Sequence, residues 1–244
     1  RGIVETCHAL RSVDPEILIA HVDATDLYHS ADPTLASEVE RRQEIVFLAL
    51  DLVSGRIDSE HALYAWLRQK GMADSDLEWF RARALELPLI GINLYPMFTS
   101  KLGGRTPAGG VRWKMPYAGA ELIEQLGAMY WERYRAPVFI SETASVGSLR
   151  RRRLWLEDSL AAVRRLRERG VPLVGYTWWP LFALVTWAYR QGTHPPEYYL
   201  KQMGLWDLDA RLQRVRTPLV DQFRALAEGG SATVGQLVGA GVHA

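Results

Sequence analysis

Four nearly continuous apolar runs dominate the pattern of this sequence. They read EILIAHV at 16–22, LPLIGINLY at 87–95, APVFIS at 136–141 and VPLVGYTWW at 171–179. Uninterrupted apolar runs of this length are typical of parallel strands that are covered on both faces. Helical periodicity fills the intervals, at 34–54, 58–70, 74–86, 117–134 and 149–169, and again at about 216–228. This alternation predicts right-handed βαβ units and a parallel sheet.

Such a sheet belongs to a doubly wound fold or to a (β/α)8 barrel. No Gly-rich phosphate loop follows a strand, because KLGGRTPAGG at 101–110 comes after a long loop and lacks the required spacing. A TIM barrel needs eight strands in about 250 residues, whereas this sequence supplies four, preceded by a helical pattern. We therefore expect an α/β fold in which residues 1–228 form the C-terminal half, about four βα units, of a (β/α)8 barrel. Residues 229–244, after a helix that ends at Gly229 and Gly230, are expected to form a disordered tail.

The composition disfavours several kinds of partner. A net charge of +1 gives no reason to expect nucleic acid or an anionic membrane. No apolar run reaches the roughly 18 residues of a membrane span, and no signal-peptide pattern opens the sequence. The basic run Arg150 to Arg153 is expected to open a solvated helix. The six histidines lack metal-ligand spacing, so no metal or other cofactor is expected. The single cysteine, Cys7, suits a reducing compartment and favours the cytoplasm.

Polar and aromatic residues stand at the ends of the four predicted strands. They are Asp23 after the first run, Asn93 and Tyr95 in the second, Glu142 after the third, and Tyr176, Trp178 and Trp179 in the fourth. In a barrel, the carboxyl ends of the strands form the active-site face. A lone carboxylate at a strand end is most often structural, but the recurrence of such ends marks Glu142 as a candidate catalytic group. Asp23 is a candidate for lining the same cleft.

Three segments resemble, in order and approximate spacing, the C-terminal half of the family 1 glycoside hydrolases, which are β-glucosidase-like (β/α)8 barrels. They are LIGINLYP, VFISETAS and GYTWWPLFALVTWAYR, the last followed by MGLWDLD. The resemblance covers residues 1–228. Its most specific part is the ordered set of Asn93 with Tyr95, then Glu142, then Trp179 with Trp187.

The resemblance implies a retaining glycoside hydrolase whose partner is a β-linked small-molecule glycoside or oligosaccharide. Glu142 matches the catalytic nucleophile, Tyr95 matches the tyrosine that orients this carboxylate, and Asn93 matches the asparagine of the same strand end. Trp179 matches the tryptophan that lies beneath the sugar, and Trp187 matches the later tryptophan of the sugar-binding loop. Retaining enzymes need a second carboxylate about 5 to 5.5 Å from the first, as acid and then base.

The last loop departs from the family pattern. Thr186 stands where the family has a glutamate that grips the outer hydroxyls of the sugar, and Ala183 and Leu184 replace the preceding Asp-Asn pair. The loop after Glu142 also differs, because Glu142 is followed by Thr143 and Ala144 where the family has Asn-Gly, and Ser141 replaces the Thr that precedes the glutamate. The usual sugar preference of the family therefore does not carry over to this chain.

The family's acid/base glutamate has no counterpart in this sequence. It belongs to an Asn-Glu-Pro motif that would fall upstream of Arg1, and the nearest carboxylate, Glu5, lies in a helical pattern. We therefore expect the chain alone to be inactive, with the acid/base supplied by residues outside it. Two alternatives stay open. One is a catalytically inactive carbohydrate-binding or appended barrel domain, and the other is a different barrel hydrolase whose nucleophile also ends the seventh strand. The oligomeric state stays open too.

Overall fold

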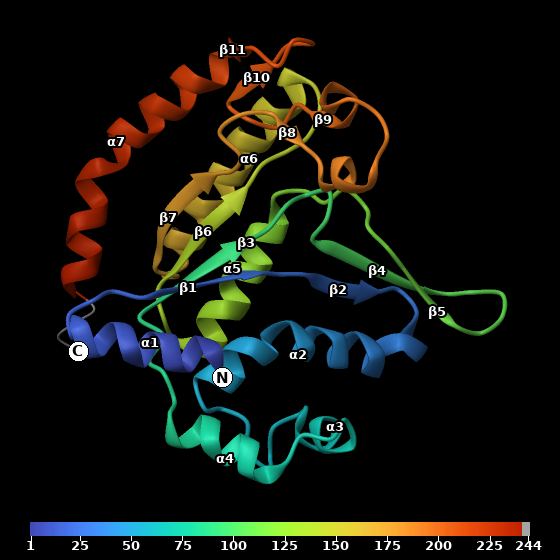
Figure 1. Cartoon of the computed structure of the whole chain (residues 1–244), viewed down its shortest axis with the longest axis vertical. Helices are drawn as coiled ribbons and strands as arrows, with labels where there is room; N and C mark the ends of the chain where they lie inside the picture. The colour runs from blue at the N-terminus through green and yellow to red at the C-terminus, as the bar shows by residue number, and fades with distance from the viewer. Residues whose placement is uncertain (241–244) are drawn as a thin grey trace.

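A four-stranded parallel sheet forms the centre of the molecule, a computed structural model that describes residues 1–240 and the side chains of residues 1–229 (Figure 1). The strand order is β1-β3-β6-β7, and all neighbours pair in parallel. The strands are β1 (Ala20–Ala24), β3 (Leu89–Asn93), β6 (Val138–Thr143) and β7 (Leu173–Trp178). Each overlaps one of the four apolar runs, so the prediction of four parallel strands is confirmed. β1 begins and ends later than its run.

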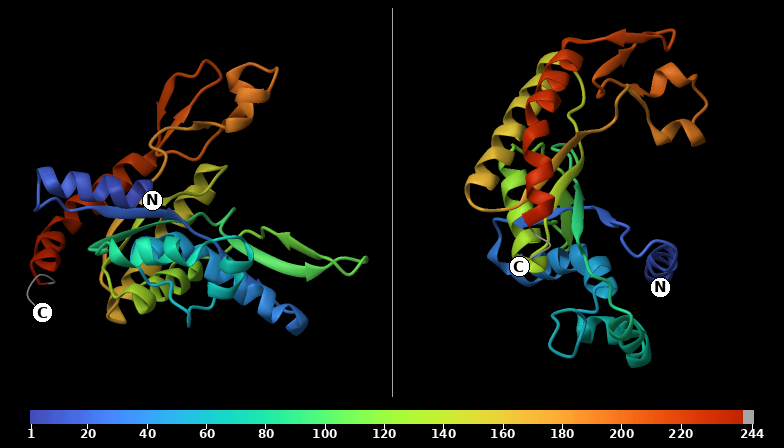
Figure 2. Two further views of the ribbon diagram at one scale, coloured as in Figure 1. Left: turned by 60° about the horizontal axis from the view of Figure 1, so that its bottom comes forward. Right: turned by 90° about the vertical axis from the view of Figure 1, so that its left-hand side faces the viewer.

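Helices cover one face of this sheet (Figure 2). They are α5 (Glu121–Tyr134), α6 (Leu149–Glu168) and α7 (Pro218–Ala240). The strand residues that point toward these helices are fully buried and belong to one apolar cluster with the helix side chains: Ile90, Ile92, Val138, Ile140 and Leu173. Apolar burial on this scale is the main stabilising contribution to such a layer.

The opposite face of the sheet has no helix across it within the described residues (Figure 2). Val22 keeps 47% of its surface exposed there. Gly91, at the middle of this face, has no room for a side chain, because a Cβ atom would lie 2.7 Å from Ser141 Oγ and 2.8 Å from Val22 Cγ2. Strands β1 and β7 are the open edges of the sheet. An open inner face between two open edges is the geometry of part of a barrel wall.

The N-terminal helices differ from prediction mainly in length. α1 (Gly2–Val13) confirms the helix expected before the first strand, and α2 (Ala36–Val53), preceded by the 3-10 turn η1 (Pro33–Leu35), fills the range 34–54. α3 (Tyr64–Gln69) and α4 (Asp74–Ala82) are shorter than expected. The residues before α3 form turns because side chains capture backbone N–H groups: Glu60 N–H donates to Asp58 Oδ1, and Leu63 N–H donates to His61 Nδ1.

α7 continues past Gly229 and Gly230, where the helix was predicted to end, as far as Ala240. The two glycines carry only a moderate helix penalty, and Ala, Leu, Val and Gln follow them. The predicted tail at 229–244 thus overlaps this helix, and its last four residues lie outside the described part. The domain boundary at residue 228 stays a prediction.

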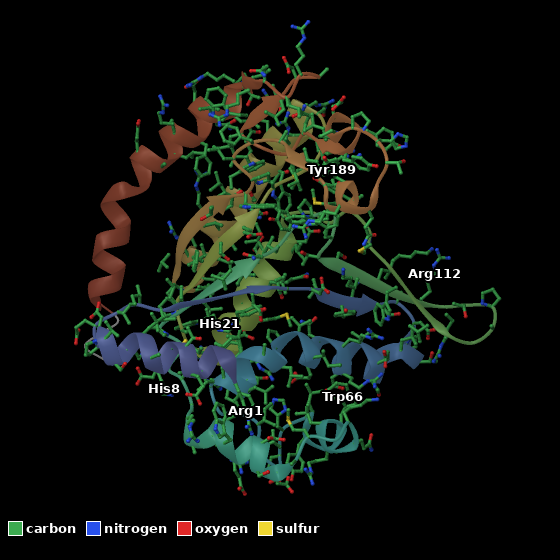
Figure 3. All side chains as sticks on the ribbon, viewed as in Figure 1. Arg1, His8, His21, Trp66, Arg112 and Tyr189 are labelled. Carbon is green, nitrogen blue, oxygen red and sulfur yellow. The ribbon has the colours of Figure 1, made fainter. Side chains whose placement is uncertain are left out.

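Short strands that the sequence pattern did not indicate form three small sheets. β2 (Leu27–Ser30), β4 (Ser100–Arg105) and β5 (Val111–Lys114) make one; β8 (Leu184–Val185) pairs with β9 (Leu200–Lys201), and β10 (Trp206–Leu208) pairs with β11 (Arg214–Arg216). The 3-10 turns η2 (Trp187–Gln191) and η3 (Pro196–Tyr199) lie between β8 and β9. KLGGRTPAGG forms most of β4 and the turn, residues 106–110, of a hairpin with β5 that extends away from the central sheet, beside Arg112 (Figure 3). Gly109 there has φ +80°, a conformation that favours glycine.

The basic run does not form a uniformly solvated helix start. It opens α6, as expected, but Arg152 is only 1% exposed. Its guanidinium donates to Asp207 at 2.6 Å and to the Gly204 carbonyl at 2.8 Å. Charge pairing therefore allows one arginine of the run to be buried, where it joins α6 to β10.

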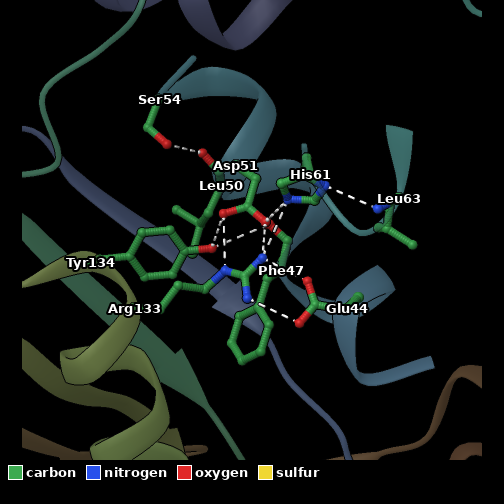
Figure 4. A network of polar contacts seen from close by, with 9 residues as sticks. All are labelled: Glu44, Phe47, Leu50, Asp51, Ser54, His61, Leu63, Arg133 and Tyr134. Atoms are coloured by element: carbon green, nitrogen blue, oxygen red, sulfur yellow. Dashed lines mark hydrogen bonds and ion pairs between the residues drawn. The ribbon is translucent and has the colours of Figure 1, made fainter. Parts of the chain in front are cut away.

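A polar network joins α2, α5 and the turn before α3 (Figure 4). Asp51 is fully buried and accepts hydrogen bonds from Arg133 at 2.6 Å and from Tyr134 at 2.9 Å, while His61 Nε2 lies 3.2 Å away. Arg133 also donates to Glu44 at 2.7 Å. Burial disfavours the charged guanidinium, but the two carboxylates outweigh this effect and raise the pKa of Arg133. The network ties three segments that are distant in sequence.

Replacing Arg133 with methionine should destabilise the fold strongly, because the buried carboxylate of Asp51 would lose its cation. We expect the free energy of unfolding to fall by about 3 to 5 kcal/mol. The matched control is Arg165→Met, which breaks a surface pair with Glu124 in which the arginine side chain is 50% exposed. That change should cost less than about 1 kcal/mol. Urea unfolding of both variants tests this, and equal losses would contradict it.

Candidate active site

The pairing between β3 and β6 places Glu142 at the end of the sheet. Ile92 pairs with Ile140, but the next residue, Asn93, pairs with Glu142, so Ser141 and Glu142 together oppose Asn93. Two residues against one is a β-bulge, a feature that re-aims side chains and is common beside active sites. β7 shows the same offset against β6. The local irregularity therefore decides where the carboxylate points.

Hydrogen bonds fix the residues on both sides of Glu142. Ser141 Oγ donates to Asn93 Oδ1 at 2.7 Å, and Trp155 Nε1 donates to Thr143 Oγ1 at 3.0 Å. The backbone N–H of Leu94, just after the end of β3, donates to the Glu142 carbonyl at 2.9 Å. Thr143 is fully buried, so its bond to Trp155 lies in a dry environment, where hydrogen bonds are electrostatically stronger. The backbone that carries Glu142 is thus held from the helix layer and from the neighbouring strand.

Tyr95 makes the direct polar contact to the carboxylate. Its hydroxyl donates to Glu142 Oε2 at 2.8 Å. Burial and this hydrogen bond raise the pKa of Tyr95 far above its ordinary value, so the phenol stays a neutral donor at ordinary pH. Trp179 packs edge-to-face against the Tyr95 ring, with centroids 6.4 Å apart. The predicted pairing of Tyr95 with Glu142 is present in the structure.

Glu142 lines a cavity of about 600 Å³. Tyr95, Trp179 and Trp187 line it, as do residues of the last loop, Leu184 and Thr186. A cavity of this size suits a small-molecule ligand, and its walls are mostly apolar and aromatic. Trp187 is 66% exposed, so its ring is accessible from solvent. Among the described residues that line the cavity, Glu142 is the sole carboxylate.

Two predicted site residues lie apart from this cavity. Asn93 is behind it, bonded to Ser141, in a supporting position. Asp23 pairs in register with Ile92 and shares its face of the sheet, which packs against helices. Burial raises the pKa of Asp23, against a smaller opposing effect of His21. The structure therefore does not bring Asp23 to the cleft.

The cavity also has walls that sequence reasoning missed. These lining residues are Met97, Phe98, Val146, Ala188, Lys201 and Met203. Met97 and Phe98 lie in the loop after β3, four and five residues beyond its last residue, so their place in the chain was a usable signal. Lys201 reaches the cavity because β9 pairs with β8, with Leu184 opposite Lys201. Because β8 and β9 have only two residues each, no sequence pattern predicts that they pair.

One group of side chains in the described part is close enough to hold a cation, namely Glu44, Asp51 and His61. It shares no residue with the Glu142 cavity. Arg133 donates to both carboxylates, so a guanidinium already compensates their charge (Figure 4). The arrangement is that of a structural ion-pair network.

Among the comparisons with known proteins, the one with solved structures shows the fold. No model of a protein family matches the sequence, and no curated protein matches it. Among solved structures, the chain is similar to a β-glucosidase from Thermotoga maritima in complex with glucoimidazole, with a TM-score of 0.75 and 16% identity. It is similar also to a family 1 β-glucosidase from the same organism, with a TM-score of 0.75 and 17% identity, and to a complex of a Thermotoga maritima β-glucosidase with deoxynojirimycin, at 0.74 and 17%.

Each of these likenesses covers 93% of this chain and 54% of the solved one. The chain thus spans about half the length of the structures it matches. At such low identities the likeness shows the fold alone. The predicted fold class is confirmed: the chain has the α/β fold of part of a (β/α)8 barrel, and its fold neighbours are glycosidases.

Buried tyrosines should make the fold sensitive to alkali. Burial is the first cause that raises the pKa of Tyr95, Tyr130 and Tyr134 above the ordinary value. Above about pH 10 the unfolded chain loses these protons and the folded chain keeps them. The stabilisation is therefore complete below about pH 10 and is lost as the pH rises beyond it.

Urea unfolding across the alkaline range, with tyrosinate absorbance followed in parallel, measures this loss. Tyr95→Phe removes one of the three phenols and should make the decrease with pH shallower than in the unaltered chain. Ionisation of all three phenols while the protein stays folded would contradict the prediction.

Proposed function

We propose that this chain is the nucleophile-bearing half of a retaining glycoside hydrolase of the family 1 type, acting on a β-linked glycoside. The observation that carries the proposal is the 2.8 Å hydrogen bond from Tyr95 to Glu142 at adjoining strand ends, in a cavity that Trp179 and Trp187 also line. The fold neighbours support it, because their structures are described as β-glucosidases bound to glucoimidazole and deoxynojirimycin.

In this mechanism Glu142 attacks the anomeric carbon, and the bond between this carbon and the leaving-group oxygen breaks. An acid protonates that oxygen as it departs, and the same group then removes a proton from the water that cleaves the glycosyl ester. Tyr95, a neutral phenol, orients the attacking carboxylate through its hydrogen bond to Oε2. The exposed face of Trp187 and the ring of Trp179 offer apolar surfaces to the sugar.

The acid/base group is assigned to residues outside this chain. Glu142 is the sole carboxylate among the described lining residues, and a retaining site needs a second one about 5 to 5.5 Å away. On this proposal the chain alone is inactive, needs no cofactor, and takes a small-molecule glycoside or oligosaccharide. None of the described helices is long and apolar enough to cross a membrane. A cytoplasmic location is part of the proposal and rests on Cys7.

A second candidate is a catalytically silent carbohydrate-binding domain. The observation that favours it is the wall of the last loop, where Leu184 and Thr186 line the cavity and provide no carboxylate. Of these two side chains, only the Thr186 hydroxyl can form a hydrogen bond with a sugar. Aromatic residues would then bind the ligand, and no bond in it would be cleaved.

A covalent trap separates the two candidates. The longest natural form of the protein is incubated with a 2-deoxy-2-fluoro glycoside that carries a good leaving group, and its peptides are analysed by mass spectrometry. The fluorine slows hydrolysis of the glycosyl ester more than the activated leaving group slows its formation. We expect the label on the peptide that contains Glu142, and turnover that Glu142→Gln lowers by roughly 10³-fold or more with folding intact.

Glu124→Gln is the matched control, because Glu124 forms surface ion pairs with Arg165 and Arg169. It should label and turn over like the unaltered protein. A folded protein that takes no label from several sugars would favour the silent domain. Retention of most activity in Glu142→Gln would remove Glu142 from the mechanism.

A further inference from the structure

A second cavity, of about 420 Å³, lies beside β2 and the first turns of α5. β2 supplies Leu27 and His29, β4 supplies Ser100, and the rest of the wall comes from residues 116–125. None of its lining residues lines the Glu142 cavity. Three segments that are distant in sequence therefore build this cavity, and its volume is in the range of small-molecule sites.

Besides the Tyr117 hydroxyl, four side chains supply the polar groups of the second cavity. His29 Nε2 and Ser100 Oγ are 2.8 Å apart and form a hydrogen bond. Glu121 and Gln125, both exposed, stand one helical turn apart on α5. Glu121 lines the cavity, and its carboxylate lies against Gly119. Together these groups both donate and accept hydrogen bonds.

An aromatic ring with a fixed orientation forms part of the apolar wall. Tyr117 is 49% exposed, and its hydroxyl lies 2.7 Å from the Oγ of Ser145, which is fully buried. The Arg151 guanidinium lies over the ring, 5.4 Å from its centroid. Leu27 and Leu122 continue the apolar surface. A ring anchored in this way loses little conformational entropy when a ligand packs against it.

The mixture of these groups selects a class of ligand. No lysine or arginine lines the cavity while Glu121 does, so an anion is disfavoured. A bare metal cation is disfavoured as well, because one carboxylate and one imidazole share the wall with apolar side chains. A neutral ligand that carries both hydroxyl groups and apolar C–H faces fits all of the lining. We propose that this cavity is a second, non-catalytic binding site for a saccharide unit.

The second cavity is adjacent to the first. The Ala118 N–H donates to the Pro96 carbonyl at 2.8 Å, and the residues after Pro96, Met97 and Phe98, line the Glu142 cavity. The segment 96–100 thus contributes to both cavities, with Met97 and Phe98 lining the first and Ser100 the second. Two saccharide sites that share one loop would hold an oligosaccharide near Glu142. Binding at the second site does not require Glu142 to be catalytic.

Proton NMR titration of the chain tests the proposal, with methyl β-D-glucopyranoside and cellobiose as probes. The ring C–H signals of His29, assigned with a His29→Gln variant, should shift in a saturable way, while those of His8, which lies on α1 away from the cavity, stay unchanged (Figure 3). Tyr117→Ala and Glu121→Gln should each raise the dissociation constant about tenfold. Glu142→Gln should leave it unchanged, whether or not the enzyme assignment holds.

Tyr198→Ala is the control for loss of an exposed aromatic ring, since Tyr198 is 64% exposed and lines neither cavity. It should bind both probes like the unaltered chain. Three outcomes would each overturn the proposal: no saturable shift of the His29 signals, a dissociation constant that neither cavity variant changes, or equal saturation by inorganic phosphate or magnesium chloride. If Tyr117→Ala does not fold, the dissociation constant of Glu121→Gln tests the proposal. This variant should fold because the Glu121 side chain is exposed.

Discussion

The pairing register between β3 and β6 determines where Glu142 lies, and the rest of the site depends on it. A strand alternates its side chains between two faces, so a shift of one residue sends each side chain to the opposite face. The bulge at Ser141 and Glu142 introduces this shift opposite Asn93. Before the bulge, Ile140 points into the helix layer, and after it Thr143 is held there by Trp155. Glu142, between them, reaches Tyr95 and the cavity.

The layer behind the sheet stabilises this register. Apolar residues of α5, α6 and the strands form one cluster that includes Trp155 and Trp178. Trp178 Nε1 donates to the Met203 carbonyl at 3.0 Å, so the same layer also fixes a residue that lines the cavity. Each of these indole groups is buried and has a partner, as buried polar groups require. Helix packing and site geometry are therefore coupled through a few side chains with both an apolar body and a donor.

The sequence predicted the sheet well because uninterrupted apolar runs and helical periodicity are strong signals over long segments. Their places at strand ends marked Glu142 and Tyr95 as candidates, and the resemblance to the family 1 glycoside hydrolases predicted that they pair. The sequence did not indicate that Asp23 shares the face of Ile92, because a continuous apolar run contains no alternation and nothing in residues 16–22 shows which face the next side chain takes. It missed the small sheets because strands of two to six residues are too short to show a period, and the longest of them, β4, contains two glycines. The cavity beside β2 is built partly by one of these sheets, so the sequence pattern did not predict it.

The composition of the Glu142 cavity suggests how the work of a complete site would be divided. The walls that this chain supplies are apolar or aromatic, apart from Glu142, Tyr95, Thr186 and Lys201. A sugar hydroxyl left unpaired in a buried site costs about 1 to 3 kcal/mol, so these few groups cannot satisfy a sugar ring by themselves. The remaining hydrogen-bond partners would have to come from the same residues outside this chain that supply the acid/base group. On the proposed function, this half therefore contributes the nucleophile and the stacking surfaces, and the other half contributes proton transfer and most of the hydroxyl recognition.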